Sequence, residues 1–233
     1  MLRAFLTAAL ACVCLFLVGC RDVRSMRRSR DVEGLIHLLS DSDDHVRIKA
    51  VDALGYVGDS RAVRPLIKAL HDSDPYVREH AARNLGCDYH SSLGCDTGEA
   101  VQPLIGVLDD EDPFVRVEAV RSLGEHPLPA SRAPIEKLAV SDPRWEVRQA
   151  AAFALGRLAD TKSRPVLEAL LDDRNEQVVK EARESLRRVA AASRPPPDGR
   201  PDVDLTVEVT DTIPSSDAGP RAQEHRAEGD GGP

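Results

Sequence analysis

A motif that recurs five times is the feature that most constrains the fold. In each copy a valine is followed by an alanine four residues later and a leucine eight residues later. The valines are Val46, Val77, Val115, Val147 and Val178, which lie 31, 38, 32 and 31 residues apart. Positions i, i+4 and i+8 line one stripe of an α-helix, so each copy predicts a helix with one buried face. In the first four copies a glycine follows the leucine, and we expect it to end the helix as a left-handed C-cap.

Each period also predicts an earlier helix, which begins near a proline and ends at an acidic turn. The prolines are Pro65, Pro103, Pro134 and Pro165. Two antiparallel helices per period cannot bury their apolar faces alone, but stacked pairs can. The chain is also poor in aromatic residues (3%), on which all-β folds commonly depend. The sequence therefore predicts an all-α fold, an α-solenoid of about five two-helix repeats over residues 31–190.

The repeated pattern, best seen from Asp74-Pro75 to Leu85-Gly86, reads DP-x-VR-x-x-A-x-x-x-LG. It resembles short HEAT repeats of the kind found in phycobilin lyases, and the resemblance extends over residues 31–190. The resemblance implies a HEAT-like α-solenoid that serves mainly as a binding scaffold.

The arginine after the valine recurs in register in four copies, as Arg47, Arg78, Arg116 and Arg148. We expect these side chains to form a structural ladder by pairing with aspartates of successive acidic turns. The alternative is a basic stripe that binds an anionic ligand.

The N-terminal residues predict export and lipid attachment. Residues 4–18 form an uncharged apolar run that is short for a membrane span. The run ends in Leu17-Val18-Gly19-Cys20, which resembles the bacterial lipobox. We therefore expect a signal peptide over 1–19, lipidation of Cys20 and a basic juxtamembrane linker over 20–30, in a lipoprotein of the bacterial cell envelope. Because arginines follow the apolar run, the alternative is an uncleaved inner-membrane anchor with a cytoplasmic body.

The longest spacing between copies contains Cys87 and Cys95. In an exported protein, two cysteines eight residues apart predict a disulfide. The alternatives are free thiols, or a metal site in which His90 and His80 join the two cysteines.

Residues 191–233 are rich in proline, glycine and acidic residues, and we expect them to be a disordered tail. Within the tail, residues 203–209 alternate between apolar and polar side chains. This segment is either a chance run or a strand that joins a sheet of another protein.

Composition and motifs favour a scaffold over an enzyme. The net charge of −8 argues against nucleic acid as a partner, because nucleic-acid binding requires a cationic surface. The sequence has no phosphate-binding glycine loop, nucleophile elbow or H-E-x-x-H motif, and we predict no cofactor and no metal. The His-Glu pairs of deoxyhypusine hydroxylase, another short-HEAT protein, have no counterpart here. The alternative is an enzyme or enzyme subunit of the lyase or hydroxylase type built on the same repeats.

A protein-binding groove is predicted on the helices that carry the repeated motif. Positions 2 and 6 after the valine point away from the stripe formed by positions 0, 4 and 8. The predicted groove residues are Ile48, Arg83, Val117, Arg121 and Phe153. We expect the apolar members of this set to be exposed and to contact a protein partner.

Overall fold

The computed structural model describes residues 22–86, 98–126 and 128–193, and in these residues every regular element is a helix. An N-terminal helix α2 (Val23–Ser29) precedes five helix pairs. The first helices of the pairs are α3 (Val32–Leu38), α5 (Val63–Ala69), α7 (Val101–Gly106), α9 (Pro129–Ser141) and α11 (Arg164–Ala169). The second helices are α4 (Asp44–Val57), α6 (Pro75–Asn84), α8 (Pro113–Glu125), α10 (Trp145–Leu158) and α12 (Glu176–Ala192). The predicted all-α solenoid of five two-helix repeats is confirmed.

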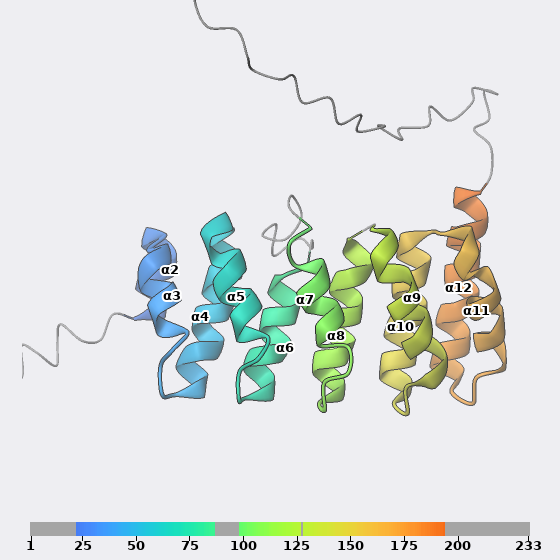
Figure 1. Cartoon of the computed structure of the whole chain (residues 1–233), viewed down its shortest axis with the longest axis horizontal. Coiled ribbons are helices and arrows are strands. Elements are labelled where there is room, and N and C mark those ends of the chain that lie inside the picture. Colours follow the sequence, from blue (N-terminus) through green and yellow to red (C-terminus); the bar gives the residue numbers. More distant parts are fainter. Residues whose placement is uncertain (1–21, 87–97, 127, 194–233) are drawn as a thin grey trace, which may run out of the picture. The chain divides into compact units, whose positions relative to one another are not determined.

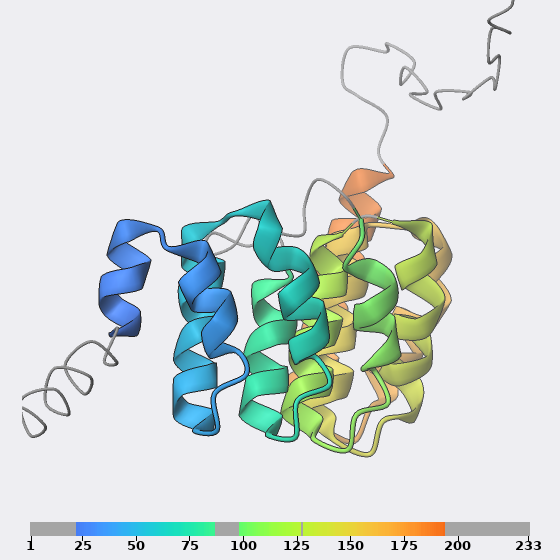
Figure 2. The same cartoon turned by 60° about the vertical axis from the view of Figure 1, so that its left-hand side comes forward.

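The second helices contact one another in chain order, from α4 to α12 (Figures 1 and 2). All turns from a first helix to its second helix lie on one edge of the array, the lower edge in Figure 1. We call this the turn edge. Aspartates of these turns cap α4, α6 and α8, as when the Asp112 carboxylate accepts a hydrogen bond from the backbone N–H of Phe114 at 2.7 Å, and an asparagine caps α12.

The repeated apolar stripe forms the core. The valine, alanine and leucine of the three inner copies are at most 1% exposed. Only at the two ends of the array are members of the stripe half-buried, namely Val46 and Leu186. The largest fully buried side chains are leucines, an isoleucine and valines, so the core contains no aromatic ring among the described residues.

The prediction that the repeated glycines are C-caps is wrong. Gly55, Gly124 and Gly156 lie inside helices, and in the described residues only Gly58 and Gly98 have a positive φ among glycines. The left-handed caps of α4 and α10 are instead Gly58 and Ala159. The helices continue past the repeated glycine because the residues that follow it still contact the core.

The repeated glycines instead permit close approach of successive second helices. A Cβ atom added at Gly124 would lie 2.7 Å from the Cβ and 2.8 Å from the Cα of Ala154 in α10. The same position of the other repeats faces Asn84, Ser122 and Ser185, the residues that correspond to Ala154. Glycine is therefore required here by the spacing between helices.

Most of the segment predicted as a basic juxtamembrane linker, residues 20–30, is the helix α2 with its caps. Asp22 caps α2 by accepting a hydrogen bond from the N–H of Arg24, and Met26 is buried against the first repeat. Arg30 then donates to the carbonyl of Val57 at 2.8 Å. Because Val23 and Met26 lie on one face, this short segment extends the core by one helix.

The prolines fall in the first turn of α5, α7 and α11, but Pro134 lies inside α9, which already begins at Pro129.

Several predictions concern residues outside the described ranges: the signal peptide and Cys20, the Cys87–Cys95 pair with His90, and the tail segment 203–209. Within the described residues no helix is long and apolar enough to span a membrane.

Candidate functional site

The four arginines predicted to form a ladder each bind an aspartate of the next turn. Each guanidinium donates two hydrogen bonds of 2.7–3.1 Å to one carboxylate. The pairs are Arg47–Asp72, Arg78–Asp110, Arg116–Asp142 and Arg148–Asp173. Each repeat is thus joined to the next by a bidentate ion pair along the turn edge.

Each ladder arginine also binds its own turn. Arg116, for example, donates through Nη1 to the carbonyl oxygens of Asp110 and Glu111 at 2.7 and 3.3 Å. The arginine and aspartate side chains of the four pairs are at most 13% exposed. Hydrogen bonds from Arg148 hold the pKa of the Asp173 carboxyl below its usual value. These guanidinium groups are all bound to carboxylates and carbonyls of the array. This argues against the alternative that they form a basic stripe that binds an anionic ligand.

The exposed side of the second helices differs from the side that was predicted from the repeated valine, alanine and leucine. Counted from the valine, positions 1, 5 and 9 of the inner repeats are buried because they face neighbouring repeats. At about 100° per residue, their burial moves the centre of the buried arc by about 50° from the direction of positions 0, 4 and 8. Positions −1, 3, 6 and 10 therefore face outward, and we call them the outer stripe.

Among the described residues, the outer stripe is exposed or half-buried except at Ala150. From α4 to α12 it contains His45, Lys49, Asp52, Tyr56, Tyr76, His80, Arg83, Phe114, Glu118, Arg121, Glu125, Glu146, Phe153, Arg157, Gln177, Glu181, Glu184 and Arg188.

Three of the five predicted groove residues, Arg83, Arg121 and Phe153, belong to this outer stripe. The other two occupy position 2, which lies closer to the neighbouring repeats. Ile48 is half-buried against the core, and Val117 is only 6% exposed. The expectation that Val117 exposes an apolar side chain is wrong, because it belongs to the hydrophobic core cluster.

Polar contacts connect the outer stripe across repeats. His80 Nδ1 lies 2.7 Å from an Asp52 carboxylate oxygen, so this histidine has a partner within the array. Arg83 binds Glu79 on its own helix and lies 3.6 Å from Glu118 on α8. These contacts place charged side chains of both signs in the middle of the stripe.

Exposed aromatic residues on the second helices are the feature that sequence reasoning missed. Tyr76 is 61% exposed and Phe114 55% exposed, both at position −1. Trp145, one position earlier in its helix, is 37% exposed. All three lie at the start of consecutive second helices, on the turn edge. The repeated sequence of an aspartate, a proline and then an aromatic residue at the next or second-next position was the signal that could have revealed them.

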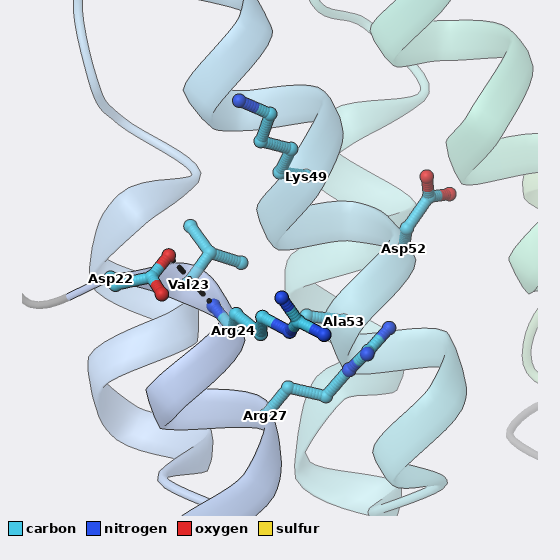
Figure 3. A pocket seen from close by; sticks show the side chains of 7 residues that line it. All are labelled: Asp22, Val23, Arg24, Arg27, Lys49, Asp52 and Ala53. Carbon is cyan, nitrogen blue, oxygen red and sulfur yellow. Dashed lines mark hydrogen bonds between the residues drawn. The ribbon is translucent and has the colours of Figure 1, made fainter.

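A second surface feature lies at the N-terminal end, where α2 meets α4. A cavity of about 350 Å³ is lined by Arg24, Arg27 and Lys49, with Asp22 and Asp52 at its margins. Figure 3 shows both arginine side chains extending from α2 toward α4. Neither arginine has a carboxylate partner among the described residues.

One group of potential metal ligands occurs in the described residues. Asp43, Asp44 and His45 could bring ligand atoms within 4.8 Å of one another at the start of α4. Asp43 and Asp44 each accept a hydrogen bond from the backbone N–H of His45, so both carboxylates serve the helix N-terminus.

Comparison with known proteins identifies the class. A family model for HEAT repeats matches residues 32–93 and 101–187, more than half of the chain, so the protein belongs to the HEAT-repeat family. No curated protein matches the sequence.

Two solved structures illustrate the similarity. The complex of CpcE and CpcF of phycocyanin lyase from Nostoc sp. PCC7120 is 27% identical, with a TM-score of 0.59 over 69% of this chain and 65% of that chain. A designed armadillo repeat protein in complex with the peptide (KR)4 is 22% identical, with a TM-score of 0.53 over 72% of this chain and 85% of that chain. The second likeness concerns the fold alone.

Proposed function

We propose that the chain is a non-enzymatic scaffold that binds a protein partner through the outer stripe of its second helices. The observation that carries the proposal is the placement of the aromatic residues. Of those that the structure describes, Tyr56, Tyr76 and Phe114 of the outer stripe are exposed and Phe153 of the stripe is half-buried. Trp145, which precedes the stripe residue Glu146, is also exposed. Aromatic side chains are enriched at protein interfaces and dominate their binding energy. Exposed rings on successive second helices, beside paired charges, fit a polypeptide partner.

Site-specific photocrosslinking in the native cells tests this proposal. A photoreactive phenylalanine analogue at Phe114 should give a discrete adduct with one partner. The control is the same analogue at Val140, which is 57% exposed but lies on α9, a first helix. Excess wild-type protein should compete for the adduct, whereas the Tyr76→Ser, Phe114→Ser double variant should not. Identical adducts from both positions, or competition by the double variant, would contradict the proposal.

Membrane attachment through Cys20 is the second part of the proposed function. It is supported by the lipobox-like Leu17-Val18-Gly19-Cys20 at the end of an apolar run. Mass spectrometry of the native protein should find Cys20 as a lipidated N-terminus, and Cys20→Ala should release the protein from membranes. An intact Met1 terminus on membrane-bound protein would favour the uncleaved anchor with a cytoplasmic body.

The similarity to CpcE and CpcF supports one alternative, that the chain is a subunit of an enzyme. Under that alternative the adduct formed at Phe114 would contain a second subunit, and only the two together would be active. Mixing purified chain with its captured partner and assaying the complex for bound chromophore or metal separates the alternatives.

A further inference from the structure

The N-terminal end of the array carries cations that have no counter-charge. Within the described residues, Arg24, Arg27 and Arg28 of α2 and Lys49 of α4 form no ion pair with a carboxylate, whereas most arginines further along the array do. Arg30 also lacks a carboxylate and is fixed by its bond to the Val57 carbonyl. Arg30 and Arg27 contact α4 through the Val57 carbonyl and the Tyr56 ring, but neither of these contacts neutralises the positive charge.

Two cavities lie around these cations, and Arg27 lines both of them. The first, drawn in Figure 3, includes the carboxylates of Asp22 and Asp52, which already bind the Arg24 N–H and His80 respectively. The second has a volume of about 560 Å³ and is lined by Arg27, Arg28, Arg30, Tyr56 and Val57, with no carboxylate. It is thus the more favourable of the two for an anion.

The side chains of the second cavity fit a phosphate group. Guanidinium groups bind phosphate oxygens through paired N–H donors, and three arginines line this cavity. The Arg27 guanidinium lies 4.8 Å from the centre of the Tyr56 ring, which restricts its position beside the cavity. The phenol of Tyr56, which is 71% exposed, adds a further donor.

We propose that the second cavity, lined by Arg27, Arg28 and Arg30, is a phosphate-binding site that places the α2 end of the array on anionic lipid headgroups. Arg24 and Lys49, which line the neighbouring cavity, add to the positive charge that attracts an anionic surface. The choice of a lipid rests on the proposed attachment at Cys20. Two residues of extended chain span at most about 7 Å, so a lipidated Cys20 would hold Asp22 within the headgroup layer. The array would then stand on the membrane by its first repeat, with the outer stripe of the later repeats accessible to a partner. A free phosphate ester is the other source of the same chemistry.

Vesicle binding by unlipidated protein tests the site separately from the anchor. The chain from residue 20 onward, with Cys20→Ser, is mixed with vesicles of phosphatidylcholine alone or with about 30% phosphatidylglycerol, at low salt. Binding is expected only with the anionic lipid. Each cation contributes about fivefold to the partition coefficient, so Arg24→Gln, Arg27→Gln, Arg28→Gln together should lower it about 100-fold.

The matched control removes the same number of positive charges elsewhere. Arg157→Gln, Lys180→Gln, Arg183→Gln alters three exposed cations that form no ion pair in the described residues, and it should leave the partition almost unchanged. An Arg→Lys triple variant of α2 keeps the charge but lacks the paired N–H donors, so it should restore only part of the binding. Circular dichroism should show equal helix content in all variants.

The outcomes distinguish a lipid headgroup from a free phosphate ester as the ligand. They also distinguish a failure of the phosphate site from a failure of the proposed anchor at Cys20. Saturable binding of inorganic phosphate that is lost in the α2 variant, without vesicle binding, would assign the site to a free phosphate ester. Equal loss of vesicle binding in the α2 variant and in the control, or no binding of either probe, would overturn the site. A native N-terminus without lipid would refute the anchor at Cys20 and leave a positive vesicle result standing.

Discussion

Replacement of Asp142 by alanine should lower the free energy of unfolding by about 3–5 kcal/mol, the usual effect of removing one partner of a buried ion pair. The Asp142 side chain is 3% exposed and that of Arg116 is 11% exposed. Without the carboxylate, Arg116 would keep only its bonds to the carbonyls of Asp110 and Glu111, with no counter-charge. The N–H of Arg144 would also lose its acceptor at 2.9 Å.

The same reasoning predicts strong coupling between the two partners. Arg116→Met alone should also cost about 3–5 kcal/mol, because it leaves a buried carboxylate without its cation. The double variant removes both charges, so its destabilisation should fall short of the sum of the single effects by about 2–4 kcal/mol. Urea unfolding followed by circular dichroism gives the free energy of unfolding of the wild type, the two single variants and the double variant. Because repeat arrays can unfold in parts, the dependence of this free energy on urea concentration should be the same in all four proteins.

An exposed pair in the same turn provides the control. Arg144 and Glu146 are 3.0 Å apart, with side chains 50% and 28% exposed, and their coupling should not exceed about 1 kcal/mol. If the coupling between Arg116 and Asp142 were equally small, the ladder would not contribute to the register of the repeats and the interpretation would be refuted.

Two further predictions concern pH and helix spacing. The pKa of Asp173 is lowered by Arg148, so its stabilisation is complete above about pH 4, the value of an unfolded aspartate, and is lost as the pH falls through the lower native pKa. The difference in melting temperature between wild type and Asp173→Asn should therefore be largest at neutral pH and shrink in acid; a constant difference would contradict this. Gly124→Ala should destabilise by about 1–3 kcal/mol, because its Cβ would overlap Ala154. Gly106→Ala, where a Cβ meets no atom within 4 Å, should be neutral or stabilise by up to about 1 kcal/mol in the same unfolding assay.

The fold was predictable from the sequence because one helix face repeats without error. A valine, alanine and leucine at spacings of four can be read directly as a buried stripe, and the inner copies are buried as expected. The arginine at the next position was identified in the same way, since its partners recur in the acidic turns.

Contacts between repeats could not be read from a single helix. The repeated glycine resembled a helix end, whereas its role depends on residues about 30 positions later, such as Ala154 opposite Gly124. The burial of positions 1, 5 and 9 follows from these same contacts, and it turned Val117 inward and moved the exposed stripe. For α2 the arginines obscured the signal, because Val23 and Met26 are its only apolar residues.

The way in which the repeats are held together also explains where the aromatic residues lie. Second helices that approach as closely as Gly124 and Ala154 leave room between them only for small side chains, and leucine and valine fill the space toward the first helices. Rings such as Tyr76 and Phe114 have no place in such an interior, and at 61% and 55% exposure they contribute little to the core. Exposed apolar surface is unfavourable in water unless something covers it. Since the ladder and the glycines already fix the register of the array, the rings are not needed for it, and they remain available for the proposed binding of a partner.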